Sequence, residues 1–114
     1  MRDDLLRHLP LKPVDFQLLL ALAEAEQHGY ALVRAIEAGT AGVVRLDPGN
    51  LYPVIKRLLG DGLVAESSRR PAVDVGDERR RYYRITALGQ RVLAAEARRL
   101  EALVRSPAVR GLTK

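Results

Sequence analysis

The stretch from Leu46 to Val64 limits the possible fold more than any other part of the chain, because it carries both the start and the stop signals of a helix. Asp47 can accept hydrogen bonds from the free amides of a first helical turn, and Pro48 suits the first helical position. Gly60 and Gly62 bracket the place where the helix would end. The stretch therefore predicts a helix from Asp47 to Gly60, followed by a strand.

This predicted helix has one apolar face and one polar face. The apolar face has the residue spacing of a buried helix side and consists of Leu51, Ile55, Leu58 and Leu59. The opposite face carries Asn50, Tyr52, Pro53, Lys56 and Arg57. A DNA major groove accepts such a face, although a solvated surface helix would show the same pattern. Because proline removes an internal hydrogen bond, the regular helix either starts near Asn50 or bends at Pro53.

Composition excludes several kinds of protein. The 114 residues suit one domain, and the absence of cysteine excludes disulfides, thiolate metal sites and cysteine nucleophiles. No segment approaches the ~18–20 apolar residues that span a bilayer, and the start of the chain is not a signal peptide, so we expect a cytoplasmic protein. Neither a catalytic motif nor a metal-ligand cluster accompanies His8 or His28. We therefore expect no enzyme, no metal and no cofactor.

The positive charge is concentrated in the second half of the chain. Residues 1–60 hold seven basic and seven acidic side chains, whereas residues 61–114 hold twelve and seven, which accounts for the whole net charge of +5. Between Arg69 and Arg84 there are six arginines against three acids. This density points to a polyanionic partner such as nucleic acid, although charged runs are often only solvated.

Further helices are expected before the Asp47–Gly60 helix. Hydrophobic spacing and breaker residues predict them at Asp3–Leu9, Val14–Glu26 and Tyr30–Ala38, with a short strand at Val43–Leu46. A third core helix with a polar outer face suggests a helix-turn-helix domain. Its eight-residue connection from Gly39 to Leu46 fits the winged variety best.

A basic hairpin is predicted to follow. Leu63–Ser68 and Arg79–Thr86 have the character of strands, and the loop between them contains Pro71 and Gly76. In the second strand we expect Tyr83 to be buried, because it shares a face with Ile85. The base of the loop carries Arg69, Arg70, Arg79, Arg80 and Arg81. A basic hairpin directly after a helix of this kind is interpreted as a wing.

The end of the chain is predicted to form a long helix from the N-cap Thr86 to about Ser106. Its apolar residues recur at spacings of 4, 3 and 4, which is typical of a helix that packs against another helix. These residues are Leu93, Ala97, Leu100 and Val104. At ~1.5 Å per residue the helix would reach roughly 30 Å, which exceeds what so small a domain covers. We therefore expect a dimer interface, with packing onto the same chain as the alternative. Pro107 would stop this helix, and the last residues, Ala108–Lys114, are expected to be frayed.

In three segments the sequence resembles the PadR family of bacterial transcriptional regulators. The segments are HGYALVRAIE at 28–37, LDPGNLYPVIKRLLGDGLV at 46–64 and RRRYYRITALG at 79–89. The resemblance implies a winged-helix dimer that represses transcription, often of a neighbouring gene, and that a small molecule often releases. The short segment after Gly89 is similar to the subgroup with a single C-terminal dimerisation helix.

The resemblance also implies which residues face DNA. On the predicted helix they are Asn50, Tyr52, Lys56 and Arg57. The family usually has Ser or Thr at the position of Asn50. At the wing tip, the Gly-Pro-Arg run common in the family is replaced by Asp74, Asp77 and Glu78. We therefore expect the wing to contact DNA through Arg79, Arg80 and Arg81.

The sequence thus predicts a mainly α protein with a small β-hairpin: a winged helix-turn-helix domain at 1–86, a dimerisation helix at 87–106 and a tail at 107–114. We expect a regulator that binds double-stranded DNA sequence-specifically as a homodimer and represses transcription from a palindromic operator. A small apolar effector could lie between Leu93, Ala97 and Leu100. The alternative is a ligand-sensing or protein-docking winged helix that does not hold DNA tightly by itself.

Overall fold

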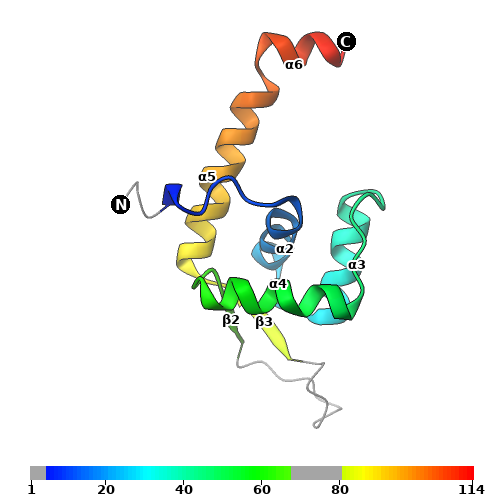
Figure 1. Ribbon diagram of the computed structural model, residues 1–114, viewed down its shortest axis with the longest axis vertical. Helices are drawn as coiled ribbons and strands as arrows, with labels where there is room; N and C mark the ends of the chain where they lie inside the picture. Colours follow the sequence, from blue (N-terminus) through cyan, green and yellow to red (C-terminus); the bar gives the residue numbers. More distant parts are fainter. Residues whose placement is uncertain (1–4, 68–80) are drawn as a thin grey trace.

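The computed structural model describes residues 5–67 and 81–114 (Figure 1). Its helices are α2 (Pro13–Glu24), α3 (Gly29–Gly39), α4 (Pro48–Gly60), α5 (Ala87–Val104) and α6 (Pro107–Leu112). Its strands are β1 (Gln27–His28), β2 (Val64–Glu66) and β3 (Tyr82–Ile85). The prediction of a mainly helical protein with a small antiparallel sheet is confirmed. Ahead of α2 lies an N-terminal arm, residues 5–12. The first two residues of the helix predicted at Asp3–Leu9 lie outside the described residues, and of its described residues Leu5 and Leu6 alone are helical.

The sheet has three antiparallel strands in the order β1-β3-β2. β2 pairs with β3 in the register Val64↔Ile85, which confirms the predicted hairpin. β1 lies on the other edge of β3, with His28 opposite Tyr82. β1 was not predicted, because a strand of two residues shows no periodicity. Tyr83 is 5 % exposed on the inner face of β3, as predicted.

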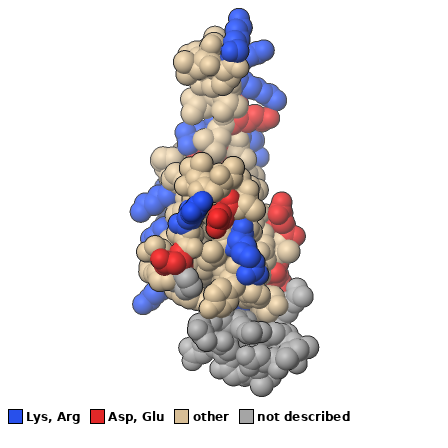
Figure 2. Space-filling view, turned by 90° about the vertical axis from the view of Figure 1, so that its right-hand side faces the viewer, with Lys and Arg blue, Asp and Glu red and all other residues tan. Residues whose placement is uncertain are grey.

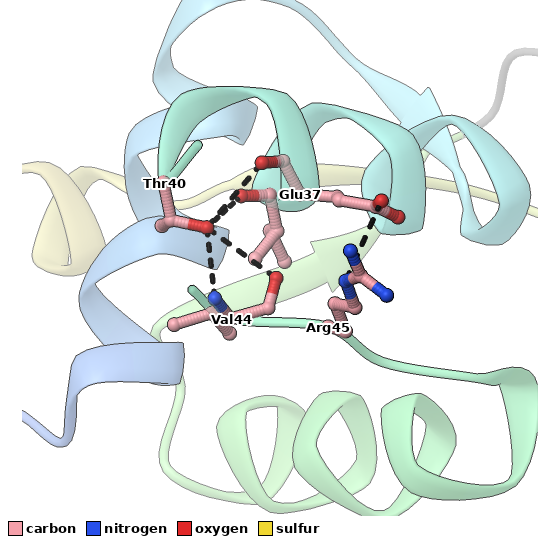
Figure 3. A network of polar contacts seen from close by, with 5 residues as sticks. Glu37, Thr40, Val44 and Arg45 are labelled. Atoms are coloured by element: carbon pink, nitrogen blue, oxygen red, sulfur yellow. Dashed lines mark hydrogen bonds and ion pairs between the residues drawn. The ribbon is translucent and has the colours of Figure 1, made fainter. Parts of the chain in front are cut away.

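The connection between α3 and α4 is a compact turn, and the strand predicted at Val43–Leu46 is wrong. Thr40 Oγ1 donates to a carbonyl in the last turn of α3 at 2.8 Å and accepts from the N–H of Val44 at 3.0 Å (Figure 3). Next to it, Arg45 pairs with Glu37 at 3.8 Å. These contacts hold the backbone of the connection against the end of α3, so that it does not extend along the sheet.

One hydrophobic core joins α2, α3, α4, the sheet and the first half of α5. Its fully buried members include Leu18, Leu19, Leu32, Ile36, Leu51, Ile55, Leu58, Leu63 and Val92. The apolar face predicted for α4 is confirmed, because Leu51, Ile55 and Leu58 each retain only 1 % of their exposure. Burying each such side chain contributes about 1.5–3 kcal/mol, so that these three residues hold α4 on the domain by its inner face.

α5 starts on the domain and extends well beyond it (Figure 1). Thr86 caps the helix by accepting from the N–H of Gly89 at 3.0 Å, as predicted. Val92 lies in the core, whereas Leu103 and Val104 are 51 % and 56 % exposed. The first half of α5 is therefore part of the domain, and the second half projects from it.

The prediction that Ala108–Lys114 is frayed is wrong for most of this segment, because α6 extends over Pro107–Leu112. Ser106 is the N-cap and accepts from the N–H of Val109 at 3.4 Å. Pro107 occupies the first helical position, where its missing N–H costs nothing. The same proline that ends α5 therefore starts α6.

The N-terminal arm is tied to α5 by a buried carboxylate. Glu96 is 1 % exposed and accepts from the backbone N–H of Leu11 at 2.9 Å. Both of its oxygens also accept from Arg99, at 2.6 and 3.0 Å. The hydrogen bonds from Arg99 lower the pKa of Glu96 against the opposing effect of burial, and the bond from Leu11 adds to the lowering. Glu96 therefore fixes the arm while it stays ionised.

Candidate nucleic-acid interface

The outer face of α4 is the main candidate surface. The helix lies across the lower side of the domain, beside β2 and β3 (Figure 1). Asp47 caps it by accepting from the N–H of Asn50 at 2.9 Å, and the helix continues from Pro48 through Pro53 to Gly60. The helix therefore starts at Pro48 and not near Asn50, which excludes the first of the two alternatives that the sequence left open.

Asn50, Pro53 and Lys56 are exposed on this face, which is opposite the core. Lys56 forms no ion pair within the described part of the chain. An exposed amide and an ammonium group, less than two helical turns apart, are suited to hydrogen-bond base edges and phosphates. The predicted polar face is thus present with at least three of its members accessible.

Tyr52 is half-buried where α4 meets the start of α3. A Cβ placed on Gly29 would lie 3.0 Å from Tyr52 Oη, so that glycine at this position allows the ring to lie close to the α3 backbone. His28 caps α3 by accepting from the N–H of Ala31 at Nδ1, at 3.3 Å. The His28 ring meets the Tyr82 ring edge-on, with centroids 5.5 Å apart. These contacts join α3, α4 and the base of the wing.

Arg57 is not simply exposed on the outer face. Its two terminal nitrogens donate to the two carboxylate oxygens of Asp15 in α2, at 2.7 and 2.8 Å. Asp15 is 4 % exposed, and its hydrogen bonds raise the pKa of Arg57. The structure therefore brings Arg57 together with a buried acid that the sequence analysis did not single out. The only signal for it was an acid on a helix that is otherwise apolar nearly all round.

The described part of the wing consists of β2, Ser67 after it, Arg81 and β3. There Arg81 pairs with Glu66 at 3.4 Å, and both side chains remain about half exposed. Arg79 and Arg80, the other predicted wing contacts, lie outside the described residues. Burial raises the pKa of the Tyr83 hydroxyl, so that this residue stays a neutral member of the core.

Charges of both signs cover the domain. On the side shown in Figure 2, acidic and basic side chains are interspersed, and further basic side chains stand out at the upper end, near α5 and α6. A polar hollow of about 200 Å³ separates the N-terminal arm from α4, with Asp15 and Arg57 in its wall. The rest of the wall of this hollow is formed by Arg7, His8, Pro10, Leu11, Lys12, Leu58, Asp61 and Leu63.

The predicted dimer residues on α5 fall into two groups. Leu93 is 8 % exposed in the core of its own chain, so the expectation that it faces a partner is corrected. Ala97 is exposed, Leu100 is half-buried, and Val104 is 56 % exposed. The apolar stripe that remains accessible to a partner chain therefore consists of Ala97, Leu100 and Val104, with Leu103 beside them.

This arrangement, a capped helix with a polar outer face beside a small antiparallel wing, is that of a winged-helix domain. The profile of the transcriptional regulator PadR-like family matches residues 18–95. The chain belongs to this family. The family consists of regulators and not of enzymes, and membership implies that this PadR-like regulator acts on transcription by binding DNA.

Individual relatives agree with this assignment. The transcriptional regulator Rv3488 of Mycobacterium tuberculosis is 35 % identical over 100 residues, which cover 88 % of this chain and 87 % of the relative. A transcriptional regulator from Clostridium thermocellum, Cth-833, has a solved structure with a TM-score of 0.62 at 27 % identity, over 79 % of this chain and 82 % of that one. A PadR-like transcription factor from Bacteroides fragilis, at 19 % identity and a TM-score of 0.64 over 78 % and 81 %, shows the same fold.

Between residues 5 and 67 and from 81 onward, three or more His, Asp or Glu side chains nowhere gather as they would around a metal ion. Among the helices that the structure describes, none is long and apolar enough to cross a membrane.

Proposed function

We propose that this PadR-like regulator is a repressor that binds a palindromic operator as a homodimer. The observation that carries the proposal is the outer face of α4, where Asn50, Pro53 and Lys56 are exposed beside the wing while the opposite face is buried. A helix of this kind fits a major groove, and a two-fold dimer would present two of them to half-sites ~10 bp apart. Such a protein would act in the cytoplasm.

Phosphate contacts would accompany the groove contacts. Lys56, Arg81 and the hydroxyl of Tyr52 lie on or beside α4 and the wing, and groups of these types commonly bind phosphate oxygens. Arg79 and Arg80 belong to the same proposal by their position next to Arg81. Each neutralised phosphate releases counterions, so that binding would weaken steeply with salt.

Dimerisation is supported by the second half of α5. Leu103 and Val104 are more than half exposed, next to Ala97 and Leu100, on a helix that leaves the domain. Large exposed apolar side chains on a projecting helix favour association with a second helix. A small apolar effector that binds between the two copies near Leu100 would change the distance between the two α4 helices and so release the operator.

The DNA surface is tested with Lys56→Ala. A duplex enriched by the protein from a random-sequence pool serves as the ligand, and affinity is measured by fluorescence anisotropy at several salt concentrations. We expect a loss of about 1–3 kcal/mol and a salt dependence reduced by about one phosphate contact. Arg98→Ala, which removes an exposed cation on α5, is the control and should bind as the wild type does. Equal affinity of Lys56→Ala and wild type would contradict the assignment of α4. It would favour the docking-module alternative, which gains some support from the interspersed charges.

The dimer surface is tested with Leu103→Glu and Val104→Glu in sedimentation velocity. We expect both variants to sediment as monomers at concentrations where the wild type is a dimer. Val43→Glu, which changes a residue that is 85 % exposed in the α3–α4 turn, should remain a dimer. A wild-type monomer, or dimers of all variants, would contradict the proposed interface.

A further inference from the structure

The contact between Asp15 and Arg57 joins two elements that are far apart in sequence. Asp15 lies in the first turn of α2 and Arg57 in the last turn of α4, 42 residues later. Both bonds of the guanidinium to the carboxylate are short, at 2.7 and 2.8 Å. A parallel pair of charge-assisted hydrogen bonds fixes direction as well as distance. We call this pair the Asp15–Arg57 latch.

The latch has one covered and one open partner. The side chain of Asp15 is 5 % exposed, and that of Arg57 is 40 % exposed. A carboxylate removed from water to this degree needs a cation or other donors, because an unpaired buried charge is strongly unfavourable. If Arg57 turned outward to a phosphate, Asp15 would lose this partner, and one exposed phosphate contact would not compensate for that loss.

The position of the latch matters for the helix that carries the DNA face. The start of α4 is held by the Asp47 cap and by the packing of Leu51 and Tyr52 against Gly29 at the start of α3. The latch holds the other end against α2. Lys56 is the residue before Arg57, so a rotation of this end of α4 would move Lys56 directly.

We propose that Asp15 and Arg57 are positioning residues, which set the orientation of α4 so that Asn50 and Lys56 face the groove, and that Arg57 itself does not contact DNA. This inference rests on the proposed function of α4. It assigns Arg57, expected from the sequence to face the groove, to α2 instead.

The substitution Asp15→Asn separates the two roles of Arg57 by the sign of its effect. If Arg57 contacts DNA, removing the competing carboxylate frees the guanidinium and strengthens binding. If the latch positions α4, the same substitution weakens binding to the enriched duplex, although the protein has become more positive by one charge. Binding to a scrambled duplex reports non-specific attraction, which a change of α4 orientation should not reduce.

The measurement is the ratio of the affinities for the enriched and scrambled duplexes, with the folded fraction checked by circular dichroism. We expect Asp15→Asn to lower this ratio by about tenfold or more, the discrimination of one good base contact. A general loss of folded protein would lower both affinities equally and leave the ratio unchanged. Glu24→Gln makes the same change of charge at an exposed position of the same helix, and it should keep the wild-type ratio.

A second variant covers the case in which Asp15→Asn does not fold. Asp15→Glu keeps the carboxylate and its charge but displaces Arg57 by one methylene group, and we expect a smaller decrease of the ratio. An unchanged or higher ratio in a folded Asp15 variant would overturn the latch. A wild type that prefers no duplex would instead overturn the proposed function, so that the two failures are distinguishable.

Discussion

Gly89 is the position at which the structure makes its sharpest prediction about stability. It lies in the first turn of α5, where a Cβ would meet the carbonyl oxygen of Leu63 at 2.2 Å and Cγ1 of Ile85 at 2.8 Å. The first of these is a backbone atom, and it also accepts from the N–H of Thr86 at 3.1 Å. Because the backbone cannot move aside as a side chain can, Gly89→Ala must push α5 away from the sheet.

The magnitude follows from two opposing effects. Forcing an extra methyl group into a filled space costs about 1–3 kcal/mol, and the contact at Gly89 is with rigid backbone, at the upper end of this range. Alanine in a helix is favoured over glycine by about 0.5–1 kcal/mol. At Gly60, in the last turn of α4, nothing lies within 4 Å of an added Cβ, so Gly60→Ala should show only the favourable effect.

The assay is thermal unfolding followed by circular dichroism. The two substitutions are chemically identical, so the favourable helix effect cancels between them, and we expect them to differ by the cost of the close contact, about 2–3 kcal/mol, which corresponds to a difference in Tm on the order of 10 °C. Gly89→Ala should also reduce DNA affinity, because a displaced α5 changes the distance between the two α4 helices of a dimer. A Gly89→Ala protein as stable as Gly60→Ala would refute the close contact between Gly89 in α5 and the carbonyl group of Leu63.

Two further predictions concern buried polar contacts. The pKa of Glu96 is lowered in the folded protein, so its stabilisation is complete above the unfolded value of about 4.3 and is lost as the pH falls through the folded value. Urea unfolding of the wild type and Glu96→Gln should therefore differ by a constant amount well above this unfolded value and converge only as the pH falls through the lowered, folded value, and an equal difference at every pH would contradict this role. Thr40→Val removes the hydroxyl that bonds to the Val44 N–H and should cost about 1–3 kcal/mol in the same assay, whereas an unchanged free energy of unfolding would show that water replaces it.

Local signals predicted the elements that carry the site. The cap at Asp47, the proline at Pro48 and the glycine at Gly60 fixed α4 nearly to the residue. Thr86 did the same for α5. These signals depend on residues within one or two turns of each other, which is why one sequence is sufficient to read them.

Contacts between distant residues could not be predicted in this way. The sequence shows Arg57 on the polar side of its helix but not that Asp15, 42 residues earlier, is within reach. Leu93 shows the seam spacing of a dimer helix, yet it lies where α5 still covers its own domain. Valines at 43 and 44 favour extended backbone, but the hydrogen bonds of Thr40 outweigh that preference. At Arg57 and Leu93 a tertiary contact overrides a correct local pattern, whereas at Val43 and Val44 a competing local hydrogen bond does so.

The most direct test of DNA recognition by a dimer is a fluorescence anisotropy titration of the wild-type protein. The labelled ligand is the duplex enriched from a random-sequence pool, with a scrambled duplex of the same composition beside it, across several salt concentrations. We expect binding to the enriched duplex to be about a thousandfold tighter or more, to weaken steeply with salt, and to saturate at two chains per duplex. Equal binding of both duplexes, or saturation at one chain, would contradict a sequence-specific dimer.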